Sequence, residues 1–429
     1  MTYDETVDYL FNCAPPFQQV GGAAYKEGLA NSIALDNHLG NPHRKFRTIH
    51  VAGTNGKGSC SHTIAATLQA AGYRVGLYTS PHLIDFRERI RVNGIPASKE
   101  FVVDFVKKEK SFFEPLQPSF FELTTAMAFS YFAQENVDVA IIEVGLGGRL
   151  DCTNIITPDL CVITNISPDH VQFLGNTMEA IAGEKAGIIK QGIPVIIGET
   201  TEATRAVFVK KANECNAPII FAEDNKEIIA ATPRSNGYTY ETELFGTMYG
   251  ELAGDYQVKN SNTILTALKQ LIGLGYNICE QSIREGFANV CSKTGLMGRW
   301  QTIATRPTTV CDAGHNIGGI TQIVNQLTRQ SYKTLRVVFG MVNDKEIDAV
   351  LAIMPKEATY YFTQASIRRA LPCEQMKEKA AAYGLKGNSY PDVATALQAA
   401  KAEAESDDFI FIGGSCFIVA DLLASMNGQ

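Results

Sequence analysis

Short apolar runs alternate with longer stretches of helical spacing along this chain. In its first half the apolar runs occupy residues 48–52, 74–79, 137–144, 160–164, 194–198 and 218–221. Between them, apolar positions recur at helical intervals, for example at 61–71 and 257–274. Short runs rich in Val and Ile that alternate with helices predict a mostly parallel α/β sheet covered on both faces.

The pattern changes twice further along the chain. Residues 222–255 are polar and rich in turn residues, so we expect a small β excursion there. A second α/β series begins near Arg299, after glycines that cluster at 293–298; its apolar runs are 308–312, 335–340, 359–363 and 408–413. A chain of 429 residues also exceeds one typical core. We predict an N-terminal domain at 1–295 and a Rossmann-like domain at 296–429.

The amino-acid composition limits the kinds of binding partner that we expect. The net charge is −7 and no basic block stands out, so neither nucleic acid nor an anionic membrane is expected as a partner. The ten cysteines form no Cys-x-x-Cys pair, which suits a reducing compartment. The acidic N-terminus does not resemble a secretory signal, and no run approaches the roughly 20 apolar residues of a membrane span. We expect a cytoplasmic monomer that acts on small molecules.

A glycine-rich loop joins the first apolar run to the first helical stretch. It has the sequence Gly53-Thr54-Asn55-Gly56-Lys57-Gly58-Ser59. Glycines let backbone N–H groups turn toward a phosphate chain, and the helix N-terminus adds partial positive charge. Lys57 can reach the terminal phosphates, and Ser59 can bind the Mg²⁺ that accompanies them. Only two residues separate Gly53 from Gly56-Lys57, fewer than in the eight-residue phosphate loop. The loop predicts ATP binding but no reaction.

Other polar residues follow neighbouring apolar runs. Glu143 lies in one such run and His170 shortly follows the next, and ligands of open parallel sheets bind at the carboxyl ends of strands. A buried carboxylate must be protonated, paired or bound to metal, and an ion pair with Arg149 is the alternative to a metal. Mostly oxygen ligands favour Mg²⁺ over zinc. Ser80 is a further candidate ligand or a turn former.

Lys185 and three positions of the second series are less specific. Lys185 ends a helical stretch, where a lysine can simply face the helix dipole. Asp312 and His315 follow an apolar run, and Arg299 could clamp a phosphate. We expect these second-domain residues to face a cleft between the two domains, and the active site to lie there.

Five motifs occur in an order that resembles a known family. They are Gly53 to Ser59, Thr79-Ser80-Pro81-His82-Leu83, Glu143 to Asp151, Asp169-His170 with Leu174-Gly175, and Glu184-Lys185-Ala186-Gly187-Ile188. Together they resemble the folylpolyglutamate synthase/dihydrofolate synthase family of the Mur ligase superfamily. The resemblance implies an ATP-dependent ligase that forms an acyl phosphate and then an amide with L-glutamate, using dihydropteroate and folates as acceptors.

The resemblance also implies roles for residues of the first domain. Thr54 to Ser59 and Asn260 would bind ATP. Ser59, Ser80 and Glu143 would bind one Mg²⁺, and Glu143, His170 and Lys185 a second. Because an ammonium cannot bind a cation, the family carboxylates this lysine at its Nζ.

The remaining implied roles concern the substrates and the second domain. Arg299 and Asp312 would contact ATP, and His315 and Ser415 glutamate or the acyl phosphate. The chain has Asp312-Ala313-Gly314-His315, where the family usually has Asp-Gly-Ala-His. The dihydropteroate site of bifunctional members matches positions Gly28, Leu29, Phe121, Glu122, Leu150 and Asp151. These last matches motivate the hypothesis that the chain carries both synthase activities.

Three alternatives remain at this point. The chain could be a folylpolyglutamate synthase only. A peptidoglycan Mur ligase shares the ATP chemistry, but it needs a further N-terminal domain and follows its lysine with Thr rather than Gly-Ser. A nucleotide-binding switch would explain the loop, but it would leave Glu143, His170 and Lys185 without a role.

Overall fold

The structure is a computed structural model that describes residues 1–14, 28–343 and 346–427. The chain divides into two compact units. Unit 1 comprises residues 1–251 and 256–296, and unit 2 comprises residues 252–255 and 297–429. Among the helices of the described ranges, none is long and apolar enough to cross a membrane.

Unit 1 is built on an eight-stranded sheet of order β4-β3-β2-β5-β1-β6-β7-β8. Strands β2, β5, β1, β6, β7 and β8 run parallel, while β3 and β4 form an antiparallel edge. The bounds are β1 (Arg47–Ala52), β2 (Val75–Tyr78), β3 (Ile90–Val92), β4 (Ile95–Pro96), β5 (Val139–Glu143), β6 (Leu160–Ile163), β7 (Val195–Ile197) and β8 (Ile219–Phe221). The predicted mostly parallel sheet is confirmed.

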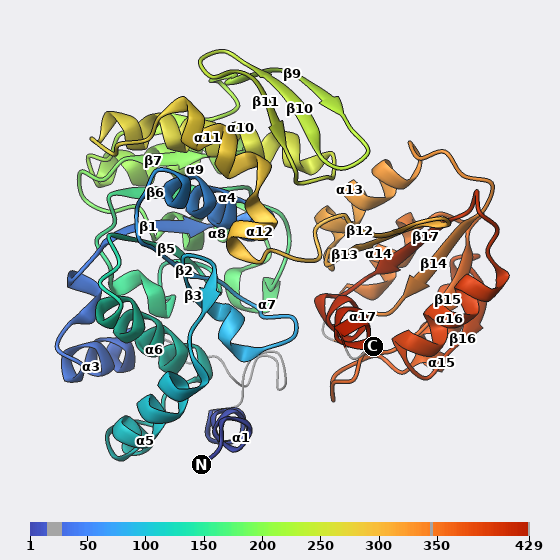
Figure 1. Cartoon of the computed structure of the whole chain (residues 1–429), viewed down its shortest axis with the longest axis horizontal. Coiled ribbons are helices and arrows are strands. Elements are labelled where there is room, and N and C mark those ends of the chain that lie inside the picture. The colour runs from blue at the N-terminus through green and yellow to red at the C-terminus, as the bar shows by residue number, and fades with distance from the viewer. Residues whose placement is uncertain (15–27, 344–345, 428–429) are drawn as a thin grey trace. The chain divides into compact units, whose positions relative to one another are not determined.

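Helices cover both faces of this sheet (Figure 1). Ile49 and Val51 face a core shared with α4 (Lys57–Ala70), α10 (Tyr256–Gly273) and α11 (Glu280–Ala288). On the other face pack α1 (Tyr3–Cys13), α3 (Ala30–His38), α5 (Lys99–Leu116), α6 (Phe120–Gln134), α8 (Met178–Ala186) and α9 (Glu202–Glu214). The shorter helices are η2 (Pro42–Arg44), η3 (Phe86–Arg89), η4 (Cys152–Ile155), α7 (Val171–Leu174) and α12 (Val290–Thr294).

The expected β excursion is a three-stranded antiparallel sheet of order β11-β10-β9. Its strands are β9 (Ile228–Pro233), β10 (Tyr238–Thr242) and β11 (Gly246–Gly250). Tyr238, Tyr240 and Met248 are buried against α10 and α11, which joins this sheet to the core of unit 1.

Unit 2 contains a six-stranded sheet of order β12-β13-β17-β14-β15-β16. All pairs are parallel except β12 with β13. The strands are β12 (Gln301–Thr305), β13 (Thr308–Asp312), β14 (Leu335–Phe339), β15 (Thr359–Phe362), β16 (Lys386–Ser389) and β17 (Phe409–Gly413). Its helices are α13 (Ile317–Leu327), α14 (Ile347–Ile353), α15 (Cys373–Ala382), α16 (Val393–Glu403) and α17 (Cys416–Asn427). The sequence prediction missed β12 and β16.

Candidate active site

The glycine loop turns sharply between β1 and α4. Gly53 has φ +143° and Gly56 has φ +84°, both in the region that favours glycine. A Cβ on Gly53 would lie 1.9 Å from Oγ1 of Thr164, and one on Gly56 would lie 2.4 Å from Oδ1 of Asn260. The helix begins at Lys57 rather than at the predicted residue 61, because Gly56 serves as the N-cap residue.

The segment that follows β6 holds this loop. The amide of Thr54 donates to the carbonyl of Asn165 at 2.9 Å, and the amide of Asn55 donates to Oδ1 of Asn165, also at 2.9 Å. The hydroxyl of Thr164 donates to the carbonyl of Asn55 at 2.5 Å. The sequence alone predicts no role for Thr164 and Asn165. The feature of the sequence that could have indicated a role is that two polar residues follow the apolar run of β6, which pairs with β1.

Two lysines meet at one backbone carbonyl of the loop. Nζ of Lys57 donates to the carbonyls of Gly53 and Thr54, both at 3.0 Å. Nζ of Lys185, from α8, donates to the same Gly53 carbonyl at 2.9 Å. Lys185 is 5% exposed. Burial, and secondly the charge of Lys57, lower the pKa of Lys185 to about 7, so that much of the amine is neutral near pH 7.

Glu143 ends β5 and lies beside the strand that leads into the loop. It pairs in register with Val51 of β1 and is 3% exposed. Ser59, in the first turn of α4, is also buried. A carboxylate and a hydroxyl are ligands that hard divalent cations prefer. Among the described residues, no group of three or more His, Cys, Asp or Glu side chains is arranged to hold a metal ion. Arg149, the alternative partner considered for Glu143, forms an ion pair with Glu184 at 2.9 Å.

The other predicted metal ligands lie on loops of unit 1. Ser80 is half-buried in the segment that follows β2. His170 is the N-cap residue of α7 in a left-handed conformation, φ +51°, with Nε2 3.8 Å from Oδ1 of Asp169. Both segments follow strands of the parallel sheet, as the sequence predicted.

A buried chain of side chains lies beneath the loop. Nε2 of Gln257 donates to Oγ of Ser59 at 3.0 Å, and Nδ2 of Asn260 donates to Oε1 of Gln257 at 2.9 Å. Asn260, predicted to contact adenine, therefore lies next to the loop at Gly56. The sequence analysis did not select Gln257, although this residue fixes the hydroxyl of Ser59.

The predicted dihydropteroate residues adjoin the loop that follows β5. The ring of Phe121 covers Gly145, where a Cβ would come within 2.5 Å of the ring, and it stacks on Tyr78 at 5.6 Å. Glu122 accepts from the amide of Ser119 at 2.6 Å as part of a capping box. Leu150 is half-buried at the end of the same loop.

Asp151 and the start of α3 complete this group. Asp151 is buried, and its carboxylate accepts hydrogen bonds from the amides of Gly145 and Leu146 at 3.0 and 2.9 Å. Burial raises the pKa of Asp151, and the hydrogen bonds that it accepts oppose that shift. Gly28, with φ +102°, and Leu29, the N-cap residue of α3, are adjacent in the chain.

In unit 2 the predicted residues lie at the carboxyl ends of β13 and β17. Asp312 accepts from the amides of Gly314 and Trp300, both at 2.8 Å. Nδ1 of His315 donates to the carbonyl of Ala313 at 3.1 Å. Ser415 is buried, and its hydroxyl accepts from the amide of Phe417 at 3.0 Å. The guanidinium of Arg299 donates to the carbonyl of Gly298 at 3.1 Å.

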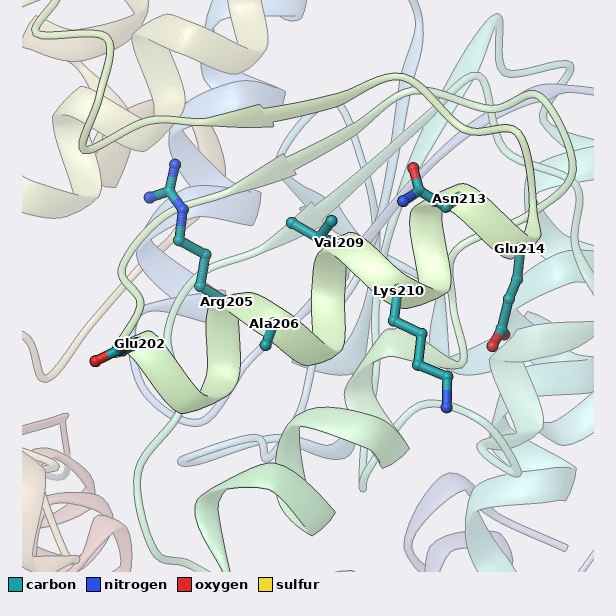
Figure 2. Close-up of a pocket in the computed structure, with 7 residues that line it drawn as sticks. All are labelled: Glu202, Arg205, Ala206, Val209, Lys210, Asn213 and Glu214. Carbon is teal, nitrogen blue, oxygen red and sulfur yellow. The ribbon is translucent and has the colours of Figure 1, made fainter.

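A separate hollow lies on the outer side of α9. Figure 2 shows the side chains that line it, from Glu202 to Glu214, all on this one helix. None of the predicted site residues lines it, and we assign it no chemistry.

Most of the chain matches known protein families. Residues 51–268 match the Mur ligase middle domain, and residues 298–416 match the Mur ligase glutamate ligase domain. The chain is 34% identical over 411 residues to the dihydrofolate synthase/folylpolyglutamate synthase of Bacillus subtilis (strain 168), covering 92% of this chain and 94% of that protein. It is 35% identical to the folylpolyglutamate synthase of Lacticaseibacillus casei, covering 82% of each.

A solved structure agrees with these matches. E. coli FolC in complex with DHPP and ADP has a TM-score of 0.85 and 30% sequence identity to this chain. The match covers 100% of this chain and 98% of the E. coli chain.

Proposed function

Because the chain belongs to the dihydrofolate synthase/folylpolyglutamate synthase family of Mur ligases, we propose that it attaches L-glutamate to folates at the expense of ATP. We assign it two acceptors, 7,8-dihydropteroate, which gives dihydrofolate, and tetrahydrofolate (poly)glutamates. The observation that carries the proposal is the meeting of Lys57 and Lys185 at the Gly53 carbonyl of the phosphate loop.

The reaction needs two displacements and no covalent bond to the enzyme. The acceptor carboxylate attacks the γ-phosphorus of ATP, and ADP leaves, which yields an acyl phosphate. The glutamate amine then attacks the acyl carbon, and phosphate leaves with formation of the amide and loss of one proton. In such a reaction a protein mainly positions the reactants and neutralises charge. The amides of residues 56–59 and Nζ of Lys57 would perform this task at the β- and γ-phosphates, since the amides of Thr54 and Asn55 already donate to Asn165.

We propose that two Mg²⁺ ions bind at the polar edge of unit 1. Ser59, Ser80 and Glu143 would hold one, and Glu143, His170 and Lys185 the other. When bound, the cations neutralise charge on the transferred phosphoryl group. The buried carboxylate of Glu143 beside β1 supports this assignment.

Lys185 fits its metal role only after carboxylation. The ammonium first loses one proton, and the neutral amine then adds to the carbon of CO₂ and releases a second proton, which leaves an anionic carbamate. The pKa of about 7 supplies neutral amine at physiological pH, and the change of sign removes the repulsion from Lys57.

The substrate roles extend over both units. Asn260 would contact adenine, and Arg299 and Asp312 would contact ATP. His315 and Ser415 would bind glutamate or the acyl phosphate. The pterin would lie against Gly28, Leu29, Phe121, Glu122, Leu150 and Asp151. We also propose that the protein is a monomer and that it is cytoplasmic; the ten free cysteines support the second assignment, because they suit a reducing compartment.

Release of ADP tests the proposal. We expect release that requires both L-glutamate and an acceptor, with dihydropteroate and tetrahydrofolate each sufficient, and with dihydrofolate as the first product. Use of tetrahydrofolate alone would restrict the chain to folylpolyglutamate synthesis. Turnover without either pterin, or with a nucleotide-sugar peptide in place of the pterin, would refute the folate function. The matched control is Lys57→Ala, which removes the phosphate ligand.

A further inference from the structure

A histidine lies in the centre of the sheet and has no role in the chemistry proposed above. His50 belongs to β1, three residues before Gly53, and is 0% exposed. Its neighbours Ile49 and Val51 face the core with α4, so the imidazole points to the opposite face of the sheet. There it contacts η4, the helical turn that follows the Gly145–Leu150 loop.

The imidazole begins a chain of hydrogen bonds. The hydroxyl of Thr153, on η4, donates to Oδ1 of Asp151 at 2.5 Å, because an ionised carboxylate can only accept. The oxygen of the same hydroxyl lies 2.8 Å from Nε2 of His50 and therefore accepts from it. This arrangement fixes the proton of the ring on Nε2.

Asp151 carries the chain into the loop that follows β5. Its Oδ2 accepts from the amides of Gly145 and Leu146, and its Oδ1 also accepts from the amide of Thr153 at 3.0 Å. The path thus runs from the strand that leads into the phosphate loop to the loop that packs under Phe121.

A purely structural role does not explain why a histidine occupies this buried position. Nδ1 of His50 is buried without a hydrogen-bond partner among the described residues. Burial lowers the pKa of His50 to about 3, so the ring is neutral and forms no ion pair at physiological pH. An apolar residue would suit the centre of a parallel sheet better, and a buried polar ring in that position requires an explanation.

We propose that His50 and Thr153 are positioning residues, which hold Asp151 and thereby set the Gly145–Leu150 loop and Phe121 for the pterin in register with the phosphate loop. They touch no substrate themselves. The proposal rests on the proposed function, because it takes dihydropteroate as the ligand of that loop.

The chain contains a matched control. His62 of α4 donates from Nδ1 to Oγ1 of Thr294 at 2.7 Å, and both residues are buried. Thr294 in turn donates to the carbonyl of Val290, in its own helix, at 2.6 Å. The two His–Thr pairs therefore differ in what lies beyond the threonine, a backbone carbonyl in one case and Asp151 in the other.

The test compares His50→Leu and Thr153→Val with the conservative His50→Gln and Thr153→Ser, and with His62→Leu. We expect the first two to raise KM for dihydropteroate about tenfold while KM for ATP stays within about twofold. The conservative variants retain a donor or hydroxyl and should approach the wild type. The double variant His50→Leu/Thr153→Val should be no worse than the poorer single variant, because both break one path.

Hydrogen exchange of the Gly145 and Leu146 amides, without substrates, provides a readout independent of turnover. Exchange should accelerate in His50→Leu and Thr153→Val, but not in His62→Leu. Unchanged exchange and unchanged KM for dihydropteroate in folded His50→Leu would overturn the proposal, as would equal increases of both KM values. If the wild-type protein does not use dihydropteroate, the proposed function fails, and the exchange data alone still support or overturn the coupling.

Discussion

Both units place polar side chains at the carboxyl ends of parallel strands, but they hold them differently. In unit 1 the bonds join distant segments: Lys185 and Gly53 are 132 residues apart, and Gln257 and Ser59 are 198 apart. In unit 2 the bonds described above join segments that are closer in the chain. Asp312 accepts from amides 2 and 12 residues away, and His315 donates to a carbonyl 2 residues away.

The difference indicates how the polar side chains of each sheet edge depend on the rest of their unit. The polar edge of unit 1 forms only when the strands, α4, α8 and α10 have all assembled, and its side chains are then buried and fixed. Such preorganised groups act strongly on developing charge. In unit 2 Asp312 and His315 are held by bonds to segments nearby in the chain, 2 to 12 residues away. We therefore expect substitutions in unit 1 to have the larger effects.

Loss of Lys185 should have the largest effect. Lys185→Ala removes both the proposed carbamate ligand and the bond to the Gly53 carbonyl, and we expect turnover to fall by about 10³-fold or more. Added acetate should restore part of the activity by supplying a carboxylate. Steady-state release of ADP measures both effects.

Lys190→Ala is the matched control for that substitution. Lys190 also donates to a carbonyl, that of Asn154 at 2.9 Å, and burial also lowers its pKa, but its bond goes to η4 and not to a carbonyl of the phosphate loop. We expect near-normal turnover in this variant. Wild-type activity in Lys185→Ala would remove the carbamate role and with it the contrast between the two units.

Gly53→Ala tests whether the loop of unit 1 has room to adjust. The added Cβ would clash with Thr164, and the alanine would also have to adopt φ +143°, which favours glycine. We therefore expect nucleotide affinity to fall by about 10²-fold. Gly183→Ala is the control, because no described atom beyond its chain neighbours and the local backbone of α8 lies within 4 Å of its Cβ position. Equal ADP affinity in the two variants, measured by calorimetry, would show that the loop adapts.

His315→Ala tests the edge of unit 2. We expect KM for glutamate to rise about tenfold with ADP binding unchanged, because the imidazole is oriented by a local bond and acts at the second step. His315→Asn retains a side-chain N–H for the Ala313 carbonyl. If it restores activity fully, the residue only shapes its loop, and a loss larger than that of Lys185→Ala would reverse the comparison.

The sequence predicted those parts of the site that depend on local pattern. The phosphate loop, Glu143 and Lys185 stand next to apolar runs or within recognisable motifs, and the structure places them at one edge of unit 1. The sequence could not predict the hydrogen-bond partners of Gln257, Thr164 or His50, because these contacts join segments about 100 to 200 residues apart.

The errors in the fold have equally local causes. The helix α4 was predicted four residues too late, because a glycine loop masks its first turn. Strand β16, with the sequence Lys-Gly-Asn-Ser, carries no apolar pattern and forms the edge of its sheet. Short polar edge strands give little signal of their own, and only pairing with β15 identifies this one.

The smallest predicted effect is that of pH, and it should act through the edge of unit 1. Only the neutral amine of Lys185 reacts with CO₂, and its pKa is about 7. About half of the amine is neutral at pH 7 and about one tenth at pH 6, so activation should be about fivefold slower at pH 6. Above pH 8 the amine is almost wholly neutral, and the rate should change little. The measurement starts from enzyme freed of CO₂ and follows the recovery of activity at constant dissolved CO₂, with every sample assayed at one common pH. A recovery rate that is equal at pH 6 and pH 8, or that falls as the pH rises, would show that the amine of Lys185 is not the group that takes up CO₂. The contrast between the two units would then rest on the geometry of their hydrogen bonds alone.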